Sequence, residues 1–232
     1  MVGIVSAVFN VAVCIGVPLG AFLVLLRRRS GWRVFLLGMA GFFVSQLCVR
    51  QPLLALLGQV DAYRLFAAGN PVGQLLFLSV TAGLAEESAR LVIFRLLARR
   101  GRVQHGTPVW YGLGHGGLEA ALVGVNSLVL LVIFPELLQR AGWAVALGGM
   151  ERISAQMVQV ALSLFVFCGL RRKRWFVAAI LLHTLCNFMT VVTLFGVSDL
   201  MLEVLLFAFA AVVLYAAIKL WKGEDFHEKN LA

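Results

Sequence analysis

Residues 79–90 read SVTAGLAEESAR and lie in the middle of an apolar run that extends from about residue 71 to residue 98. Two adjacent carboxylates, Glu86 and Glu87, and the guanidinium of Arg90 therefore fall inside a segment long enough to cross a bilayer. One ionised carboxylate near the bilayer centre costs roughly 2.5–3.5 kcal/mol on insertion scales, so these charges need partners. On a helix both acids lie within four residues of Arg90 and can approach its guanidinium. The stretch predicts a buried polar centre inside a bundle of membrane-spanning helices.

Composition supports a membrane protein over its whole length. The 232 residues are 61% hydrophobic and 13% charged, with a mean hydropathy of +0.94. A soluble domain is about 45–50% apolar and about 25% charged, so we expect an all-α, polytopic integral membrane protein. The net charge of +9 does not indicate a nucleic-acid partner, because the basic residues gather in short loops between apolar runs. The four cysteines lie in apolar segments without metal-site spacing and are expected to pack as small buried side chains.

Seven apolar runs follow one another, each long enough to span roughly 30 Å of hydrocarbon. These runs are residues 2–26, 34–57, 71–98, 108–133, 143–170, 175–195 and 199–221. They predict a single transmembrane helical domain over residues 1–222, with about seven spans, and a short cytoplasmic tail at residues 223–232. We expect the protein to reside in a bacterial cytoplasmic membrane, with the lipid bilayer as its surroundings.

The distribution of basic residues predicts the orientation of the bundle. Fifteen of the twenty Lys and Arg residues lie in the loops at 27–33, 95–102 and 171–174 and in the C-terminal segment. All four of these regions lie on one side if the seven runs cross the membrane in turn. By the positive-inside rule that side is cytoplasmic, so the N-terminus is expected outside and the C-terminus in the cytoplasm.

Further polar residues occur in the spans at similar depth. Two motifs place a histidine four residues before a second polar group, His115-Gly-Gly-Leu-Glu119 and His183-Thr-Leu-Cys-Asn187. At helical rise, Glu87, His115 and His183 lie roughly 10–12 Å from the basic ends of their spans. The groups at roughly 16–18 Å by the same count are Glu119, Gln159 and Asn187. We therefore expect these spans to pack together around the polar groups, helped by the glycines that flank His115.

This set of residue types is suited to hydrolysis of an amide bond. A desolvated carboxylate near a positive charge and two imidazoles can hold and deprotonate a water molecule. Alternatively, His115 and His183 can bind Zn²⁺, with a glutamate as third ligand or base. Asn187 or a histidine would donate a hydrogen bond to the developing oxyanion. A lone histidine in a span is often a packing residue, but two such motifs beside Glu-Glu-x-x-Arg argue against that interpretation.

The remaining charges in the spans have simpler interpretations. Arg90 is expected to act as counter-ion to the glutamates rather than to contact substrate. Glu151 and Arg152 are expected to form an intrahelical ion pair or an anchor near the outer leaflet. Arg50, which precedes Pro52, is interpreted as a buried counter-charge.

The ordered motifs resemble the YhfC family of intramembrane proteases over nearly the whole chain. The motifs that support the resemblance are Gln46-x-x-x-Arg50-x-Pro52, Glu86-Glu87-x-x-Arg90, His115-Gly-Gly-Leu-Glu119, Glu151-Arg152 and His183-x-x-x-Asn187. That family is similar to the clan of the CAAX-prenyl endopeptidases, bacteriocin-processing proteases, PrsW and the APH-1 subunit of γ-secretase. The resemblance implies that Glu86 activates water, assisted by Glu87, His115, His183 and Asn187.

One position departs from the family pattern as the resemblance gives it. A histidine tends to follow Glu-Arg by about eight positions, where this chain has Gln159. Glutamine is a poor zinc ligand, so the departure favours a metal-free, glutamate-dependent mechanism and also leaves room for an inactive relative.

The leading hypothesis is an intramembrane endopeptidase that cleaves a membrane protein or a lipidated or hydrophobic peptide. No cofactor is favoured, although zinc held by His115 and His183 remains an alternative. Arg90, Glu119 and Gln159 are expected to support the catalytic groups. A second hypothesis is a non-catalytic membrane scaffold or chaperone on the same fold. A third is a proton-coupled transporter, against which the chain shows no internal repeat.

Overall fold

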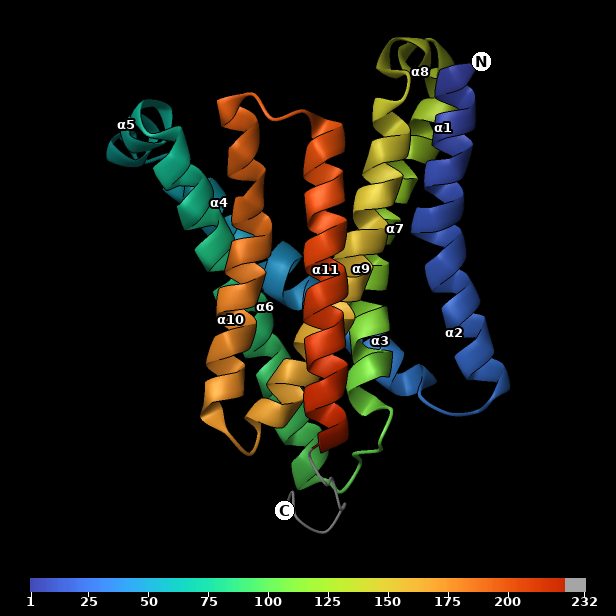
Figure 1. Ribbon diagram of the computed structural model, residues 1–232, viewed down its shortest axis with the longest axis vertical. Coiled ribbons are helices and arrows are strands. Elements are labelled where there is room, and N and C mark those ends of the chain that lie inside the picture. The colour runs from blue at the N-terminus through green and yellow to red at the C-terminus, as the bar shows by residue number, and fades with distance from the viewer. Residues whose placement is uncertain (224–232) are drawn as a thin grey trace.

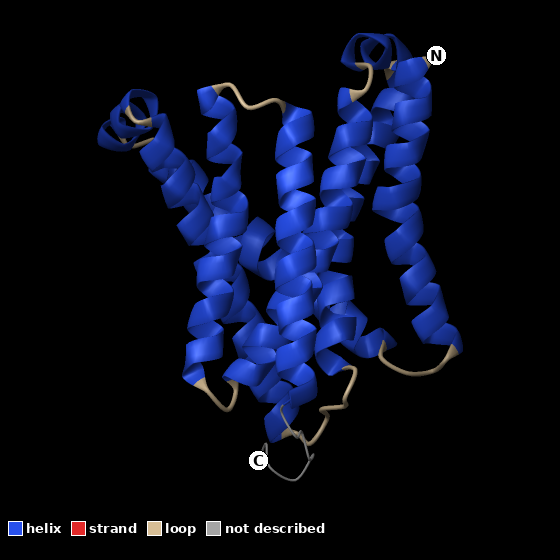
Figure 2. Cartoon of the chain, viewed as in Figure 1, coloured by secondary structure: helices blue, strands red, loops and turns tan. Residues whose placement is uncertain are grey.

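The protein is a bundle of long helices that run roughly along one axis, as the computed structural model shows (Figure 1). The structure describes residues 1–223, and all regular elements in this range are helical (Figure 2). Within these described residues, six helices are long and apolar enough to cross a membrane, or seven if one bent pair counts as a span. The prediction of an all-α polytopic membrane protein is therefore confirmed. The expected cytoplasmic tail lies outside the described residues except for Gly223.

The first two spans each change helical pitch before a proline. Their elements are α1 (Val2–Val11), η1 (Ala12–Gly16) and α2 (Val17–Arg27), then α3 (Trp32–Phe42), η2 (Phe43–Arg50) and α4 (Gln51–Leu57). Both η1 and η2 are π-helical, and the helices that follow them carry Pro18 and Pro52 in their first turn. A proline removes one backbone hydrogen bond and crowds the preceding turn, and the wider π turn accommodates it. The span thus continues through Arg50 and Pro52 with a local widening of the helix.

The remaining spans lie close to their expected bounds. They are α6 (Pro71–Arg99), α7 (Thr107–Ile133), α9 (Ala144–Gly169), α10 (Lys173–Phe188) with the 3₁₀ segment η3 (Met189–Phe195), and α11 (Asp199–Gly223). Helix α6 is capped by Asn70, whose Oδ1 accepts a hydrogen bond from Gly73 N at 2.8 Å. Two short helices that the sequence analysis did not identify, α5 (Asp61–Gly69) and α8 (Pro135–Ala141), lie at the same end of the bundle as the N-terminus (Figure 1).

The basic loops lie together at the opposite end. The turns between α2 and α3, α6 and α7, and α9 and α10 all lie there, and α11 ends there as well (Figure 1). This common position is what the positive-inside argument requires. The assignment of that end to the cytoplasm remains a prediction.

Glycines bring α7 close to two neighbours. A side chain at Gly114 would collide with the backbone of Phe35 on α3, and one at Gly38 with the backbone of α7 beside His115. A side chain at Gly112 would similarly meet the backbone of α9. These contacts allow the close helix approach expected around His115, because glycine leaves backbone against backbone.

An aromatic core lies between the polar centre and the basic end. Phe94 of α6 packs edge-on against Tyr111 of α7 at 4.9 Å and against Phe167 of α9 at 5.4 Å between ring centroids. All three side chains are fully buried or nearly so. This core holds α6, α7 and α9 together one to two turns from Arg90 and His115.

Candidate functional site

Glu86 of α6 lies at the centre of a polar cluster formed by side chains from four other elements. Its Oε1 accepts a hydrogen bond of 2.6 Å from Gln46 Nε2 on η2. Its Oε2 lies 2.8 Å from His115 Nε2 on α7 and 3.1 Å from Gln159 Nε2 on α9. The Nε2 atom of His183 on α10 is 3.8 Å from the same Oε2. His115 and His183, which were predicted to lie at one depth, and Gln159, which was predicted to lie deeper, are therefore brought together around Glu86.

Glu87 faces a different set of partners although it is the next residue. Its Oε1 lies 2.7 Å from His183 Nδ1, and its Oε2 accepts a hydrogen bond of 3.0 Å from Arg90 Nη1. Glu87 and Arg90 are both fully buried. The expectation that both acids approach Arg90 is wrong for Glu86, since successive helical residues point about 100° apart and only Glu87 faces the guanidinium. Arg90 is the counter-ion of Glu87, as the simpler interpretation of this residue required.

Gln159 connects the two halves of the cluster. Its Oε1 accepts a hydrogen bond of 2.5 Å from Arg90 Nη2. Its Nε2 donates to Glu86 and also to Glu119 Oε2, at 3.0 Å. One amide thus satisfies a buried cation with its oxygen and two carboxylates with its nitrogen. A histidine would not offer the same acceptor and donor from one end of the side chain.

Arg152 belongs to the same network. Its Nη1 donates to Glu119 Oε1 at 2.6 Å, and its Nη2 donates to Glu151. The expected ion pair with Glu151 is present, but the assignment of this pair to an isolated outer-leaflet position was incomplete. Arg152 precedes Gln159 by seven residues, so the two side chains share a face of α9 and both reach Glu119. That seven-residue spacing was the signal in the sequence that the analysis missed.

Arg50 supports Gln46 through a direct hydrogen bond. Its Nη1 donates to Gln46 Oε1 at 3.0 Å, its Nη2 to Leu78 O at 2.8 Å and its Nε to Thr81 Oγ1 at 3.2 Å. No carboxylate lies within ion-pair distance of Arg50 in residues 1–223. Arg50 therefore reaches Glu86 through Gln46 and not through a direct ion pair, so its predicted role as a counter-charge stays a prediction. Because Arg50 binds the amide oxygen of Gln46, the amide nitrogen is left to face Glu86.

Two cavities meet at Glu86. One of about 260 Å³ lies among α6, α7, α9, α10 and α11, and another of about 390 Å³ lies among η2, α6, α7 and α10. The residues that line both are Glu86, Glu119 and Asn187. His183 lines the smaller cavity, whereas Glu87 and His115 line neither. Water or substrate in either cavity can therefore reach the carboxylate of Glu86, whereas His115 contacts this carboxylate from outside both cavities and Glu87 faces His183 and Arg90.

Asn187 lies at this junction with its amide free. Its side chain is exposed and has no hydrogen-bond partner among the described residues, although its backbone carbonyl accepts from Thr190 at 2.9 Å. An amide that is unpaired beside Glu86 can donate to a carbonyl oxygen of a bound peptide.

The described residues do not form a metal centre as they are arranged. Within residues 1–223 no group of three or more His, Cys, Asp or Glu side chains has positions that hold one ion. Glu86 Oε2, the atom closest to both imidazoles, is already hydrogen-bonded by His115 and Gln159. His115 Nδ1 is buried without a partner and faces away from that contact. The donor set therefore does not fit a bound zinc ion in this arrangement.

Glu203 of α11 is a further intramembrane acid that the sequence analysis overlooked. It lies in the last predicted span, is only 8% exposed, and its Oε2 is buried without a hydrogen-bond partner. It lines neither cavity at Glu86. Its position four residues into α11 could have been read from the span boundaries in the same way as the other four acids.

The chain is similar to known proteins over most of its length. Residues 13–142 and 135–208 match the family described as YhfC intramembrane metalloprotease. The chain is 29% identical over 245 aligned positions to a protein of Bacillus subtilis (strain 168) named uncharacterized membrane protein YhfC, with 90% of this chain and 92% of the relative covered. No solved structure shows significant similarity to it. The chain is thus an integral membrane protein that belongs to the YhfC intramembrane metalloprotease family.

Proposed function

We propose that this protein is an intramembrane endopeptidase in which the carboxylate of Glu86 activates the attacking water. The observation that carries the proposal is the position of Glu86, which lines two cavities and is held by hydrogen bonds from three side chains, Gln46, His115 and Gln159, the two glutamines lining a cavity as well. Buried donors hold the carboxylate in one orientation, so its free lone pairs are directed towards the cavities. The family name supports a protease in general terms, and the assignment of roles to residues is our own.

The proposed reaction begins with a water molecule held by Glu86 at the junction of the cavities. Glu86 takes a proton from this water as the oxygen forms a bond to the carbonyl carbon of the scissile peptide. Asn187 donates a hydrogen bond to the carbonyl oxygen as negative charge develops on it. The proton on Glu86 then passes to the amide nitrogen as the carbon–nitrogen bond breaks, which releases an amine and a carboxylic acid. No step is assigned to a metal ion.

The two histidines have different positions and therefore different proposed roles. His183 lines the smaller cavity, and Glu87 holds its Nδ1, so its Nε2 is directed towards Glu86 and a bound substrate. A neighbouring carboxylate fixes the tautomer of an imidazole in this way and stabilises its cationic form. His115 contacts Glu86 from the side away from both cavities and positions the carboxylate. Glu87 and Arg90 act only through His183 and Gln159.

The cavity walls favour an apolar substrate. The larger cavity is lined by Phe42, Leu47, Leu75, Leu78 and Leu122 in addition to the polar groups. Such a wall suits a hydrophobic segment of a membrane protein or a lipidated peptide, because apolar side chains leave lipid for apolar surroundings at little cost. Glu119 and Arg152 at the other side of the junction would contact the polar backbone of an unwound segment.

The test compares purified wild-type protein with Glu86→Gln, His115→Ala and, as a matched control, Glu136→Gln on α8, an exposed acid distant from the cavities. Each is incubated with a library of membrane peptides, products are identified by mass spectrometry, and bound metal is measured on the same samples. We expect wild type and Glu136→Gln to cleave the same bonds and Glu86→Gln to lose at least about three orders of magnitude in rate.

Two results would redirect the proposal. Stoichiometric zinc that is lost in His115→Ala would assign water activation to a metal ion, in agreement with the family name. A folded wild-type protein that cleaves nothing in the library would support the scaffold hypothesis. The observation that favours this hypothesis is Gln159, which stands where the family pattern tends to have a histidine. Size-exclusion profiles and melting temperatures of all four proteins separate loss of chemistry from loss of fold.

A further inference from the structure

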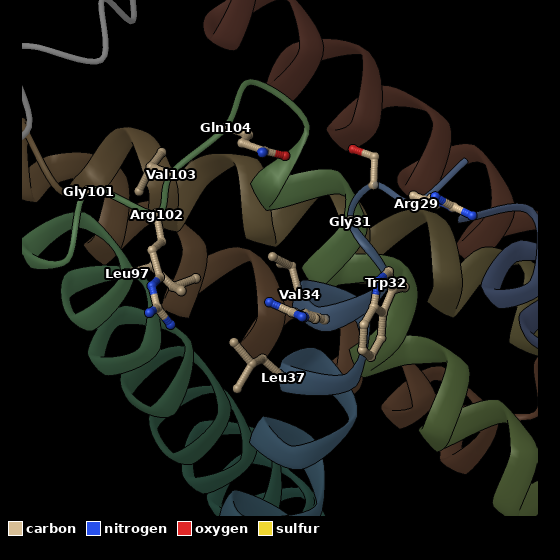
Figure 3. A pocket seen from close by; sticks show the side chains of 12 residues that line it. Arg29, Gly31, Trp32, Val34, Leu37, Leu97, Gly101, Arg102, Val103 and Gln104 are labelled. Carbon is tan, nitrogen blue, oxygen red and sulfur yellow. The ribbon is translucent and has the colours of Figure 1, made fainter. Parts of the chain in front are cut away.

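A large pocket at the basic end of the bundle is separate from the cavities at Glu86. It has a volume of about 810 Å³ and lies between the α2–α3 turn, the start of α3, the end of α6 and the segment that follows α6. Figure 3 shows Leu97 and Arg102 on one wall and Val34 and Leu37 on the facing wall. None of its lining residues lines either cavity at Glu86.

Three arginines that have no acidic partner within residues 1–223 line this pocket. Arg29, Arg33 and Arg102 are exposed, and none forms an ion pair or a side-chain hydrogen bond with any residue in the described part of the chain. The guanidinium of Arg33 lies over the ring of Trp32, 5.1 Å from its centroid. Three arginines that line one hollow, with no carboxylate among its described lining residues, make a positive site whose natural ligand is an anion. Guanidinium groups are particularly suited to phosphate, which they can bind with two parallel hydrogen bonds.

The backbone fixes the walls that present these arginines. Arg29 itself has a φ of 51°, and Gly31 and Gly101 have φ values of 78° and 59°. The backbone of Gly31 packs directly against the ring of Trp110, which leaves no room for a side chain. An arginine in the left-handed region of backbone conformation is uncommon and costs roughly 1–2 kcal/mol, so the surrounding turn must hold Arg29 there. Arg29 is therefore presented by a constrained turn, Arg33 by the first turn of α3, and Arg102 by the residue that follows the turn at Gly101.

The pocket has an apolar wall beside its arginines, and this wall would contact a bound lipid but not a small soluble anion. Its apolar wall consists of Val34, Leu37, Leu97 and Val103, next to the arginines. Leu37 is exposed and Leu97 is buried, so the apolar wall continues from the pocket onto the lipid-facing surface of α3. A free phosphate ion would use only the arginines. A phospholipid would place its phosphate on them and its acyl chains along the apolar wall.

We propose that this pocket binds the phosphate group of an anionic phospholipid from the leaflet on the basic side of the membrane. Basic pockets between transmembrane helices at a membrane surface bind anionic headgroups through the same chemistry. The first turn of α3, which has no side-chain cap, adds backbone N–H groups at the same mouth. This site is independent of the proposed peptidase chemistry, and its test does not depend on cleavage.

The test uses the full-length protein in detergent micelles and compares two triple variants of equal charge. The pocket variant is Arg29→Gln, Arg33→Gln and Arg102→Gln. The control variant is Arg27→Gln, Arg28→Gln and Arg100→Gln, three exposed arginines in the same two loop regions that do not line the pocket. Phosphatidylglycerol and phosphatidylcholine with identical acyl chains are titrated, and bound lipid is counted by native mass spectrometry.

We expect wild type and the control variant to bind phosphatidylglycerol in preference to phosphatidylcholine. Each arginine near an anionic lipid contributes about a fivefold factor, so the pocket variant should bind phosphatidylglycerol roughly 100-fold more weakly. Equal binding by the two triple variants would overturn the proposal, because charge in these loops and not the pocket would then decide the affinity. Melting temperatures are measured in parallel, and Arg33→Gln and Arg102→Gln are tested singly so that a misfolded triple variant does not decide the result.

A second arm distinguishes a lipid from a soluble phosphate. Inorganic phosphate and the water-soluble headgroup glycerophosphoglycerol are titrated as competitors, and Leu37→Gln reports on the apolar wall. For a lipid site, the soluble compounds compete only weakly and Leu37→Gln reduces phosphatidylglycerol binding. Full competition by inorganic phosphate, with no effect of Leu37→Gln, would show that the arginines take a soluble phosphate, and the assignment to a lipid would be wrong.

Discussion

Replacement of Gln159 by leucine tests whether this residue is the amide that holds the polar cluster together. The substitution keeps a side chain of similar size but removes the acceptor of Arg90 and a donor to both Glu86 and Glu119. Arg90 is fully buried, so its Nη2 has no water to replace the lost acceptor. Glu86 keeps the contact with His115, and the side chain of Glu119 is 24% exposed and can be hydrated.

The loss of stability expected for Gln159→Leu depends on which groups it leaves without a hydrogen-bond partner. A buried donor without a partner costs roughly 1–3 kcal/mol, and more when it is charged. The unpaired Nη2 of Arg90 accounts for most of the loss and the two carboxylates for the rest, so we expect Gln159→Leu to lower the free energy of unfolding by about 2–4 kcal/mol. For a protein of this size that corresponds to a fall of about 5–15 °C in melting temperature.

Gln156 supplies a matched control on the same helix. It lies one turn from Gln159, and its Nε2 makes a hydrogen bond of 3.1 Å to Gly112 O. Gln156→Leu therefore removes one hydrogen bond to a neutral carbonyl, which is worth about 1 kcal/mol. Thermal denaturation in detergent, followed by the fraction of monodisperse protein, compares the two variants. The reasoning is refuted if Gln159→Leu melts within about 2 °C of Gln156→Leu, since both would then be ordinary single contacts.

Three further predictions address packing, burial and orientation. Gly114→Ala is expected to lower the melting temperature, because the added Cβ would collide with the Phe35 backbone. Gly20→Ala is the control: a Cβ at Gly20 has no atom within 4 Å, so this variant should preserve or raise the melting temperature. Equal effects of the two substitutions would contradict the close α3–α7 contact. Glu203→Leu is expected to raise the free energy of unfolding by about 1–3 kcal/mol, since it removes a buried oxygen without a partner, and a lower melting temperature would reveal a partner. A fluorescent protein fused after Ala232 should fluoresce and a periplasmic phosphatase fused there should be inactive in a bacterial membrane; the reverse pattern would invert the orientation.

The long spans and the depth of their polar groups were predictable because both depend on distance along the chain. A helix advances a fixed rise per residue, so a count from the basic loops placed His115 and His183 at the level of Glu87 without knowledge of which helices are neighbours. The short helices α5 and α8 were missed because each is under ten residues and has no apolar run of membrane length. Helical segments of that length are stabilised by tertiary packing and leave a weak signal in the sequence.

Partner choice within the cluster was not predictable, because it depends on how each helix is rotated about its axis. Arg50 illustrates this, since its position in a span suggested an acidic partner. The π-helical turn of η2 directs it instead to a carbonyl and a hydroxyl of α6 and to the amide of Gln46. A π turn changes the direction of every following side chain, and the sequence before Pro52 indicates only that some adjustment is needed.

The different surroundings of Glu86 and Glu87 also follow from the rotation of a helix, here α6, about its axis. Adjacent side chains on a helix project about 100° apart, so Glu86 can line a cavity while Glu87 is enclosed, even though both approach His183. In this protein Glu87 is neutralised by Arg90 and holds His183, whereas Glu86 receives only donors that are neutral or titratable. A fixed cation on Glu86 would weaken it as a base by stabilising its charged form, whereas the amides of Gln46 and Gln159 orient it with less of that effect. In the proposed mechanism the enclosed acid leaves its neighbour to face the cavities, and the glutamine at position 159 orients that neighbour without adding a charge.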